Sequence, residues 1–398
     1  MAFRKLSSIV YGTQILVFIS ASTIDLLAGI FSRDLLKLLH LFPLSLLLFP
    51  MLMEVRGDLS GIYSGRLSTG LNLETMRPSL LNNTAEFYAL FQAILTLSFI
   101  EGLMLASIAN ITAILTIPSA SLFIVHTFSV SVNCLFMSTI ISVPINTIIT
   151  SRGYSKGINP DLISYPIASS ICDLLIVIVY LATLLLSLFS IELSIVLTLL
   201  FSLLSTFLIV KNRRNGRFIS VVKEGSLAVF STLVFGTLAG LTLTSIHGII
   251  EKNIFIIVMY PVLLTLVGDV GAAIGSDITT QIALGSIGMN LKSALLSRRK
   301  EKISSLISMI SAILFTSFLS QLVVICSLTE FAVALSLFIV VAISSSVMVM
   351  IVVAVLSIYT FKRGLDPDHF LIPIESSFSD FVTTIFLASA SVITPLFS

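Results

Sequence analysis

Four aspartates stand in matching sequence contexts in the two halves of this chain, and all four lie within strongly apolar segments. Asp58 ends a Pro-(x)₆-Gly-Asp motif that begins at Pro50, and the same motif begins again at Pro261, 211 residues later (from 50 to 261), and ends at Asp269. A carboxylate in the hydrocarbon region of a bilayer costs about 2.5–3.5 kcal/mol on insertion scales. Acids retained at such places are therefore candidates for a functional site.

A second motif is also duplicated and also ends in an aspartate. Its first copy leads to Asp173 and its second to Asp380, at a constant offset of 207 residues (from 173 to 380). The shared positions are two prolines, an acid and a serine pair, which stand at Pro160, Asp161, Pro166 and Ser169-Ser170, and at Pro367, Asp368, Pro373 and Ser376-Ser377. Duplicated acids in register suggest a site built on a pseudo-two-fold axis.

The chemistry that these carboxylates favour is cation binding. Each copy of the second motif begins one residue before its first proline, at Asn159 and at Asp366. Asp173 and Asp380 lie 14 residues after these starting points, about 21 Å into a helix at 1.5 Å per residue, and Asp58 and Asp269 reach a similar depth. Carboxylate oxygens suit hard cations, and Mg²⁺ usually keeps several waters and uses one or two carboxylates. We predict that these four aspartates form the metal site. Na⁺ or H⁺ binding, or hydrogen bonding to neighbouring helices alone, are the alternatives.

Other residues in the apolar segments have no matching partner in the other half. Asp25, Glu54, Glu101 and Glu375 are acids of this kind, and an accessory role for them stays open. Arg66 corresponds to Asp277, and an ion pair across the two repeats is one interpretation.

Gly57, inside the first motif, is followed by Gly61 and Gly65 at intervals of four residues. Such spacing allows close helix packing. A second interpretation, compatible with the first, is that it exposes backbone oxygens to an ion.

Composition excludes most soluble classes. Of 398 residues, 56% are hydrophobic and 11% charged, and the mean hydropathy is +1.10, which predicts a polytopic membrane protein. The basic residues are scattered, so no nucleic-acid surface is expected. The four histidines and three cysteines lack metal-ligand or disulfide patterns, and neither a G-x-x-x-x-G-K-[ST] loop nor a G-x-S-x-G motif occurs. We therefore expect no organic cofactor and no enzyme activity.

Apolar runs long enough to span a bilayer predict eleven helices in an all-α membrane protein. They lie near 6–31, 35–70, 87–109, 118–149, 163–189, 191–210, 218–249, 253–287, 304–326, 331–360 and 370–397. The motifs pair the second run with the eighth and the fifth with the eleventh. We therefore divide the chain into a five-helix repeat at 1–190, a linker helix at 191–210 and a second five-helix repeat at 211–398. Because five spans end on the opposite side from their start, the linker makes the repeats parallel.

The basic residues predict the orientation of these helices. With the N-terminus inside, seventeen Lys and Arg residues fall in inside segments, whereas only Arg33, Lys37 and Lys252 fall outside. This bias predicts an inside N-terminus and an outside C-terminus.

The motifs resemble those of the MgtE-type magnesium transporters, and most closely the eukaryotic solute carriers in which two MgtE-like copies are fused. The resemblance rests on residues 56–59 and 64–69, in and after the first motif, and on residues 159–173, which form the second motif. It covers nearly the whole chain. It implies a transporter of divalent cations in the cell (plasma) membrane, with Mg²⁺ as the main ion and Mn²⁺ or other divalent cations as alternatives. Asp173 and Asp380 match the family's pore-lining aspartate, whereas Asp58 and Asp269 stand where the family usually has asparagine.

Three other functions compete with divalent-cation transport. A sodium- or proton-coupled exchanger would use the same acids. An intramembrane aspartyl protease would need a G-x-G-D motif, whose first glycine is missing before both Asp58 and Asp269. A membrane scaffold would not explain four matched acids. With divalent cations and the lipid bilayer as partners, one chain suffices for a pore, and a homodimer is possible.

Overall fold

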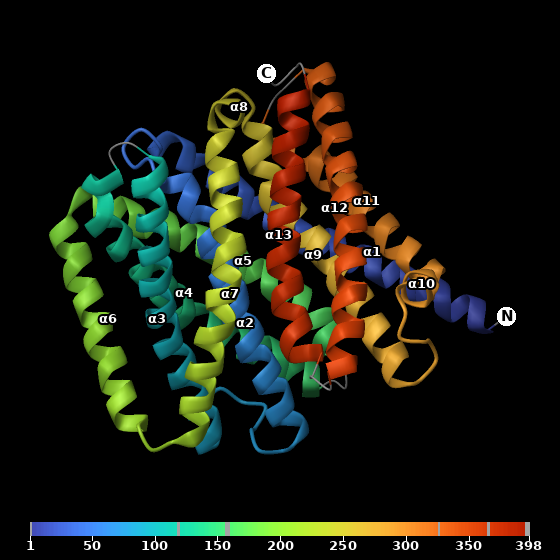
Figure 1. Cartoon of the computed structure of the whole chain (residues 1–398), viewed down its shortest axis with the longest axis horizontal. Helices are drawn as coiled ribbons and strands as arrows, with labels where there is room; N and C mark the ends of the chain where they lie inside the picture. The colour runs from blue at the N-terminus through green and yellow to red at the C-terminus, as the bar shows by residue number, and fades with distance from the viewer. Residues whose placement is uncertain (1, 118–119, 156–159, 325–326, 364–366, 395–398) are drawn as a thin grey trace. The chain divides into compact units, whose positions relative to one another are not determined.

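Most of the described chain is helical, and its described residues contain no β-strand (Figure 1). A computed structural model describes residues 2–117, 120–155, 160–324, 327–363 and 367–394. Asn159, Asp366 and Cys326 lie outside these ranges, as do the side chains of Asp161, Pro166, Asp368 and Pro373. The eleven long helices are α1 (Ala2–Leu38), α2 (Ser45–Asn72), α3 (Ala85–Thr116), α4 (Ile124–Ser155), α5 (Pro160–Phe189), α6 (Ile191–Asn212), α7 (Gly216–Ser245), α9 (Ile254–Ala283), α11 (Arg299–Ser320), α12 (Leu328–Arg363) and α13 (Pro367–Ile393).

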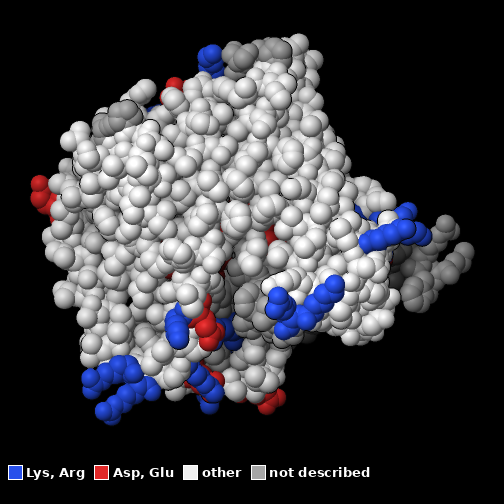
Figure 2. Space-filling model, viewed as in Figure 1, with Lys and Arg blue, Asp and Glu red and all other residues white. Residues whose placement is uncertain are grey.

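These long helices confirm an all-α membrane protein with two repeats. Ten of the described helices are long and apolar enough to cross a membrane. The eleventh long helix, α2, has 28 residues but carries Glu54, Arg56 and Asp58 near its middle. Two short helices, α8 (His247–Lys252) and α10 (Leu291–Leu296), and one 3₁₀ turn (Ala120–Phe123) lie between the long helices and were not predicted. In Figure 2 most of the visible face is formed by uncharged residues.

Local signals explain where several helices begin. Thr84 precedes α3, and its side chain accepts a hydrogen bond from the Phe87 backbone N–H. Ser190 alone separates α5 from α6; its backbone is extended, and its side chain accepts from the Leu193 N–H. Serine and threonine favour such positions because they satisfy N–H groups that the first helical turn leaves unbonded.

The chain divides into two compact units. The first-half unit contains Asp34–Gly240, and the second-half unit contains Met1–Arg33 together with Leu241–Ser398. Most of α1 therefore belongs with α9–α13, and most of α7 belongs with α2–α6. The repeat boundaries at 1–190, 191–210 and 211–398 stay a prediction, because compactness does not test sequence duplication.

We call α1 and α7 the exchanged helices, because most of each packs in the unit formed by the other half of the chain. They make equivalent contacts in their two units. A Cβ atom on Gly240 of α7 would collide with the Leu47 carbonyl oxygen of α2, and one on Gly29 of α1 would collide with the Val258 carbonyl oxygen of α9. Gly240 and Val258 stand 211 residues after Gly29 and Leu47, respectively. This is the offset of the first motif, so the contact itself is duplicated. Glycine permits these close approaches because it has no Cβ.

The helix predicted as a linker, α6, packs within the first-half unit. Its Phe201 stacks on Phe136 of α4 with ring centroids 4.4 Å apart. Near its end, the Asn212 Nδ2 atom donates to the Gln92 Oε1 atom of α3 at 2.8 Å. The opposite side of α6 exposes Leu199 and Leu203, as expected for a helix with a lipid-facing surface.

Candidate cation site

The first-half unit holds a buried ion pair at the predicted site. The Arg56 guanidinium of α2 bonds the Asp173 carboxylate of α5 through Nη2 and Oδ1. Its Nη1 atom also donates to the Ser169 carbonyl oxygen at 3.3 Å. Both charged side chains are buried, with 5% and 6% of their surfaces exposed. Asp173 therefore lies inside its unit with a positive charge already against it.

Asp58 lies on the same helix as Arg56 but has a different direct partner. The Thr232 hydroxyl of α7 donates to the Asp58 Oδ2 atom, and Asp58 is buried. The positive charge of Arg56 acts on both Asp58 and Asp173. The exchanged helix α7 thus supplies a direct hydrogen bond to one of the four predicted aspartates.

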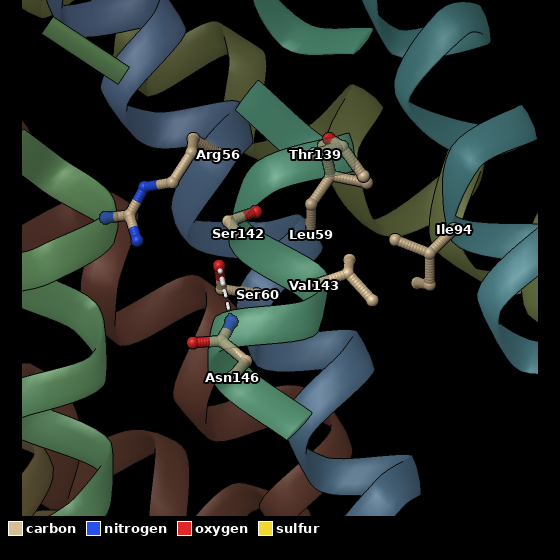
Figure 3. A pocket seen from close by; sticks show the side chains of 8 residues that line it. All are labelled: Arg56, Leu59, Ser60, Ile94, Thr139, Ser142, Val143 and Asn146. Atoms are coloured by element: carbon tan, nitrogen blue, oxygen red, sulfur yellow. Dashed lines mark hydrogen bonds between the residues drawn. The ribbon is translucent and has the colours of Figure 1, made fainter. Parts of the chain in front are cut away.

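A small cavity adjoins Arg56 between α2, α3 and α4 (Figure 3). It has room for about one water molecule. On its polar side, the Asn146 Nδ2 atom donates to the Ser60 Oγ atom at 3.4 Å. Its lining is formed by Arg56, Leu59, Ser60, Ile94, Thr139, Ser142, Val143 and Asn146.

The other two predicted aspartates, Asp269 and Asp380, lie in the second-half unit. Asp269 is on α9 and Asp380 on α13, and both are partly exposed. The two helices run antiparallel, because Tyr260 meets Thr384 through hydroxyls 2.9 Å apart whereas Gly268 meets Ser379. The helices that carry the predicted aspartates thus pack in two pairs, α2 with α5 and α9 with α13.

Glu375 of α13 packs against α9 and is buried, with 3% of its surface exposed. Its Oε1 atom lies against the α9 backbone at Gly271, where a Cβ would collide with it. That oxygen has no hydrogen-bond partner among the described residues. The charges of Asp380 and Asp269 both act on it. Glu375 is thus a buried acid beside two predicted site residues.

Glu101 of α3 is a comparable acid in the first-half unit. It is fully buried, and neither of its carboxylate oxygens has a hydrogen-bond partner in the described part of the chain. Asp58 is the charged group that acts on it most strongly.

The ion pair suggested between Arg66 and Asp277 is not what the described contacts show. Arg66 pairs with Glu224 of α7 at 2.6 Å, and Asp277 pairs with Arg298 at 3.1 Å. Each partner lies in the same unit as the residue it neutralises. Arg66 thus pairs with a residue of the second predicted repeat inside the first-half unit, and Asp277 pairs with a residue of its own repeat.

The glycine spacing in α2 does not mark a close helix contact within the described structure. A Cβ atom on Gly57, Gly61 or Gly65 would meet no described atom within 4 Å. Close approaches to a backbone carbonyl oxygen occur instead at Gly29 and Gly240, which the spacing did not indicate. Exposure of α2 backbone oxygens to an ion stays a prediction.

No group of three or more His, Cys, Asp or Glu side chains in the described ranges is spaced to hold a metal ion directly. Whether the four aspartates bind a metal therefore stays a prediction. Mg²⁺ commonly binds through its own waters, so the absence of a closed cage among the described residues does not argue against a hydrated ion.

Family comparison decides the class of protein. The MgtE family, described as divalent cation transporters, matches residues 49–183 and 260–390. The chain belongs to the MgtE family. The two matched regions fall one in each sequence repeat and contain the two copies of both motifs. As an MgtE protein, this chain is a membrane transporter of divalent cations.

Comparisons with individual proteins add little to the MgtE assignment. No curated protein matches the chain. The crystal structure of the eukaryotic MATE transporter AtDTX14 aligns over 97% of this chain and 96% of that one, at 12% identity and a TM-score of 0.26. This likeness is too weak to support an argument about the fold or the transported substrate.

Sequence reasoning missed Arg56 and Thr232 as site residues. Arg56 stands two residues before Asp58, inside the first motif, and Val267 takes its place in the second copy. Comparing the two motif copies position by position would have singled it out. Thr232 has no such signal, because its contact depends on the packing of α7.

Proposed function

We propose that this MgtE protein transports Mg²⁺ along a path lined by Asp173, Asp380, Asp58 and Asp269. Membership in a divalent cation transporter family supports the class of substrate. The observation that carries the rest is that both repeats keep two aspartates in mid-helix, on helices α2, α5, α9 and α13. We expect the path to follow the pseudo-two-fold axis that the duplication implies.

Physical chemistry favours Mg²⁺ over larger or softer ions as the principal substrate. Carboxylate oxygens suit hard ions, and few carboxylates acting through retained waters are typical for Mg²⁺. Mn²⁺ has similar ligand preferences and is a plausible second substrate. One chain carries both repeats, so a monomer suffices for the path, and we propose the cell membrane as its location.

The direct test is ion flux into liposomes that contain the purified full-length protein. Mg²⁺, Mn²⁺, Co²⁺ and Ni²⁺ are supplied in turn, with protein-free liposomes and Asp380→Asn protein as controls. We expect Mg²⁺ entry that requires the protein and falls sharply in the Asp380→Asn variant. Equal flux in the wild type and this variant would exclude the proposed path.

The same liposomes test the exchanger alternative. Flux is measured with and without sodium and proton gradients of either direction. If Mg²⁺ moves only when one of these gradients is imposed, the protein is a coupled exchanger rather than a uniporter or channel.

A further inference from the structure

The turn between α6 and α7 gathers basic side chains that have no acidic partner. Lys211, Arg213 and Arg214 are all exposed, and none of them forms an ion pair with a described residue. Arg217, the next basic residue, pairs with Glu86 of α3. Basic side chains gather in Figure 2 at the lower left, where α6 ends and α7 begins in Figure 1. The turn therefore presents three positive charges that the described residues leave without a counter-charge.

The two asparagines of this turn hold it in place. The Asn212 Nδ2 atom donates to the Gln92 Oε1 atom of α3 at 2.8 Å. The Asn215 Oδ1 atom accepts from two backbone N–H groups in the first turn of α7, at 3.1 and 3.3 Å. A segment that is already ordered loses less conformational freedom when it binds a ligand. The turn thus positions the three basic residues before any ligand arrives.

Alpha helix α6 also presents an apolar stripe to the bilayer. It is the least buried of the ten candidate spans in the described chain, with 22% of its most apolar stretch buried inside the protein. Residues spaced by three or four positions lie on one face of a helix. The α6 stripe consists of four residues with this spacing, each more than half exposed: Leu199, Leu203, Phe207 and Val210.

The α6 stripe leads directly to the basic turn. Lys211 follows Phe207 by four residues, and Arg214 follows Val210 by four. Arg213 keeps a right-handed helical backbone conformation, so the same face continues past the last residue of α6. From its first residue to Lys211 the stripe rises about 18 Å at 1.5 Å per residue. One leaflet of a hydrocarbon core of roughly 30 Å is about 15 Å thick, so the stripe has the length of one acyl chain.

We propose that the α6 stripe and the α6–α7 turn form a binding site for an anionic phospholipid. An acyl chain lies along the stripe, and Lys211, Arg213 and Arg214 bind the phosphate and the acidic headgroup. Guanidinium groups bond phosphate and carboxylate oxygens in pairs, and long basic side chains at helix ends reach the headgroup level. The predicted orientation places this turn inside, where the leaflet is rich in acidic lipids.

Lipid binding is measured by native mass spectrometry on the purified full-length protein in detergent. The protein is titrated with phosphatidylserine or with phosphatidylcholine of the same acyl chains. The test variant combines Lys211→Gln, Arg213→Gln and Arg214→Gln. We expect wild type to bind phosphatidylserine about tenfold or more tightly than phosphatidylcholine, and the triple variant to lose most of this preference. Equal affinity of wild type for the two lipids would overturn the proposal.

A matched control removes the same number of charges elsewhere. Lys292→Gln, Arg299→Gln and Lys300→Gln are combined in a second triple variant, because these residues are also exposed and lie in another predicted inside segment. This variant should keep the wild-type preference within about twofold, since attraction between charges falls off over a Debye length. Equal losses in the two triple variants would show that diffuse positive charge, rather than a site on α6, attracts the lipid.

Two further measurements test the stripe and guard against misfolding. Glycerophosphoserine, the headgroup without acyl chains, should not displace the lipid; displacement at equal concentration would indicate a site for free anions and overturn the role of the stripe. If the first triple variant does not fold, Arg214→Gln alone should weaken phosphatidylserine binding about threefold, and unchanged binding would contradict the proposal. A dimer that covers α6 and retains no lipid would also contradict it.

Discussion

The Arg56 guanidinium and the Asp173 carboxylate form a buried ion pair that joins α2 to α5. Removing one partner of a buried pair leaves an uncompensated charge and typically costs about 3–5 kcal/mol. A substitution at Asp173 therefore affects both folding and any cation path. Transport measurements on such a variant need a stability measurement beside them.

Asp173→Asn should accordingly destabilise the protein by about 3–5 kcal/mol, because Arg56 would stay charged and buried. Arg56→Leu combined with Asp173→Asn should be less destabilised than Asp173→Asn alone, since no lone charge remains. Thermal unfolding in detergent is monitored by circular dichroism for four proteins: wild type, Arg56→Leu, Asp173→Asn and the double variant. Their unfolding midpoints complete a double-mutant cycle. Strict additivity of the two single effects would mean that the pair does not couple.

The hydrogen bond from Thr232 to Asp58 can be tested without changing a charge. Thr232→Val removes the hydroxyl at nearly constant volume and leaves a buried carboxylate oxygen without its donor, which costs about 1–3 kcal/mol. Thr232→Ser keeps the donor and should unfold near the wild-type temperature. If both variants unfold at the same temperature, the hydrogen bond makes no contribution to stability.

The two duplicated glycine contacts predict paired packing defects. Gly29→Ala and Gly240→Ala each place a Cβ against a backbone carbonyl oxygen, and overpacking of this kind costs about 1–3 kcal/mol. Gly61→Ala is the control, because its Cβ would meet no described atom within 4 Å. Unfolding midpoints should fall for the first two variants and hold or rise for the control, since alanine favours helix.

Removal of Mg²⁺ should lower stability if the ion binds the folded protein. A ligand present at 100 times its dissociation constant stabilises the folded state by about 2.7 kcal/mol. The unfolding midpoint should therefore rise with added Mg²⁺ and fall with a chelator, and Asp380→Asn should lose most of this dependence. An unchanged Mg²⁺ dependence in Asp380→Asn would show that this aspartate does not bind the ion.

The number and type of the long helices could be predicted because long apolar runs leave little choice in a bilayer. The run at 253–287 is α9 (Ile254–Ala283), and the run at 191–210 is α6 (Ile191–Asn212). Boundaries were less accurate where amphipathic turns extend a span, as in α1 (Ala2–Leu38), which was predicted at 6–31. Hydropathy does not register such extensions.

Side-chain partners were less predictable than helices. Mid-helix positions for Asp58 and Asp173 followed from motif spacing, and both lie inside α2 and α5. The motif spacing gives Arg56 no role, although it is the direct partner of Asp173. The assignment of α1 and α7 to opposite units could not be predicted, because periodicity describes one helix and not its distant neighbours.

The exchange of α1 and α7 has a consequence for synthesis at the ribosome. Ser32 of α1 donates to the Ile257 carbonyl oxygen of α9 at 3.2 Å, yet these residues are 225 positions apart. At roughly 5–20 residues per second, α9 follows α1 by on the order of ten seconds or more. During that interval α1 must stay in the bilayer or beside the insertion machinery without its final neighbour. A nascent chain arrested before α9 would therefore hold an α1 helix that has not yet reached its native packing.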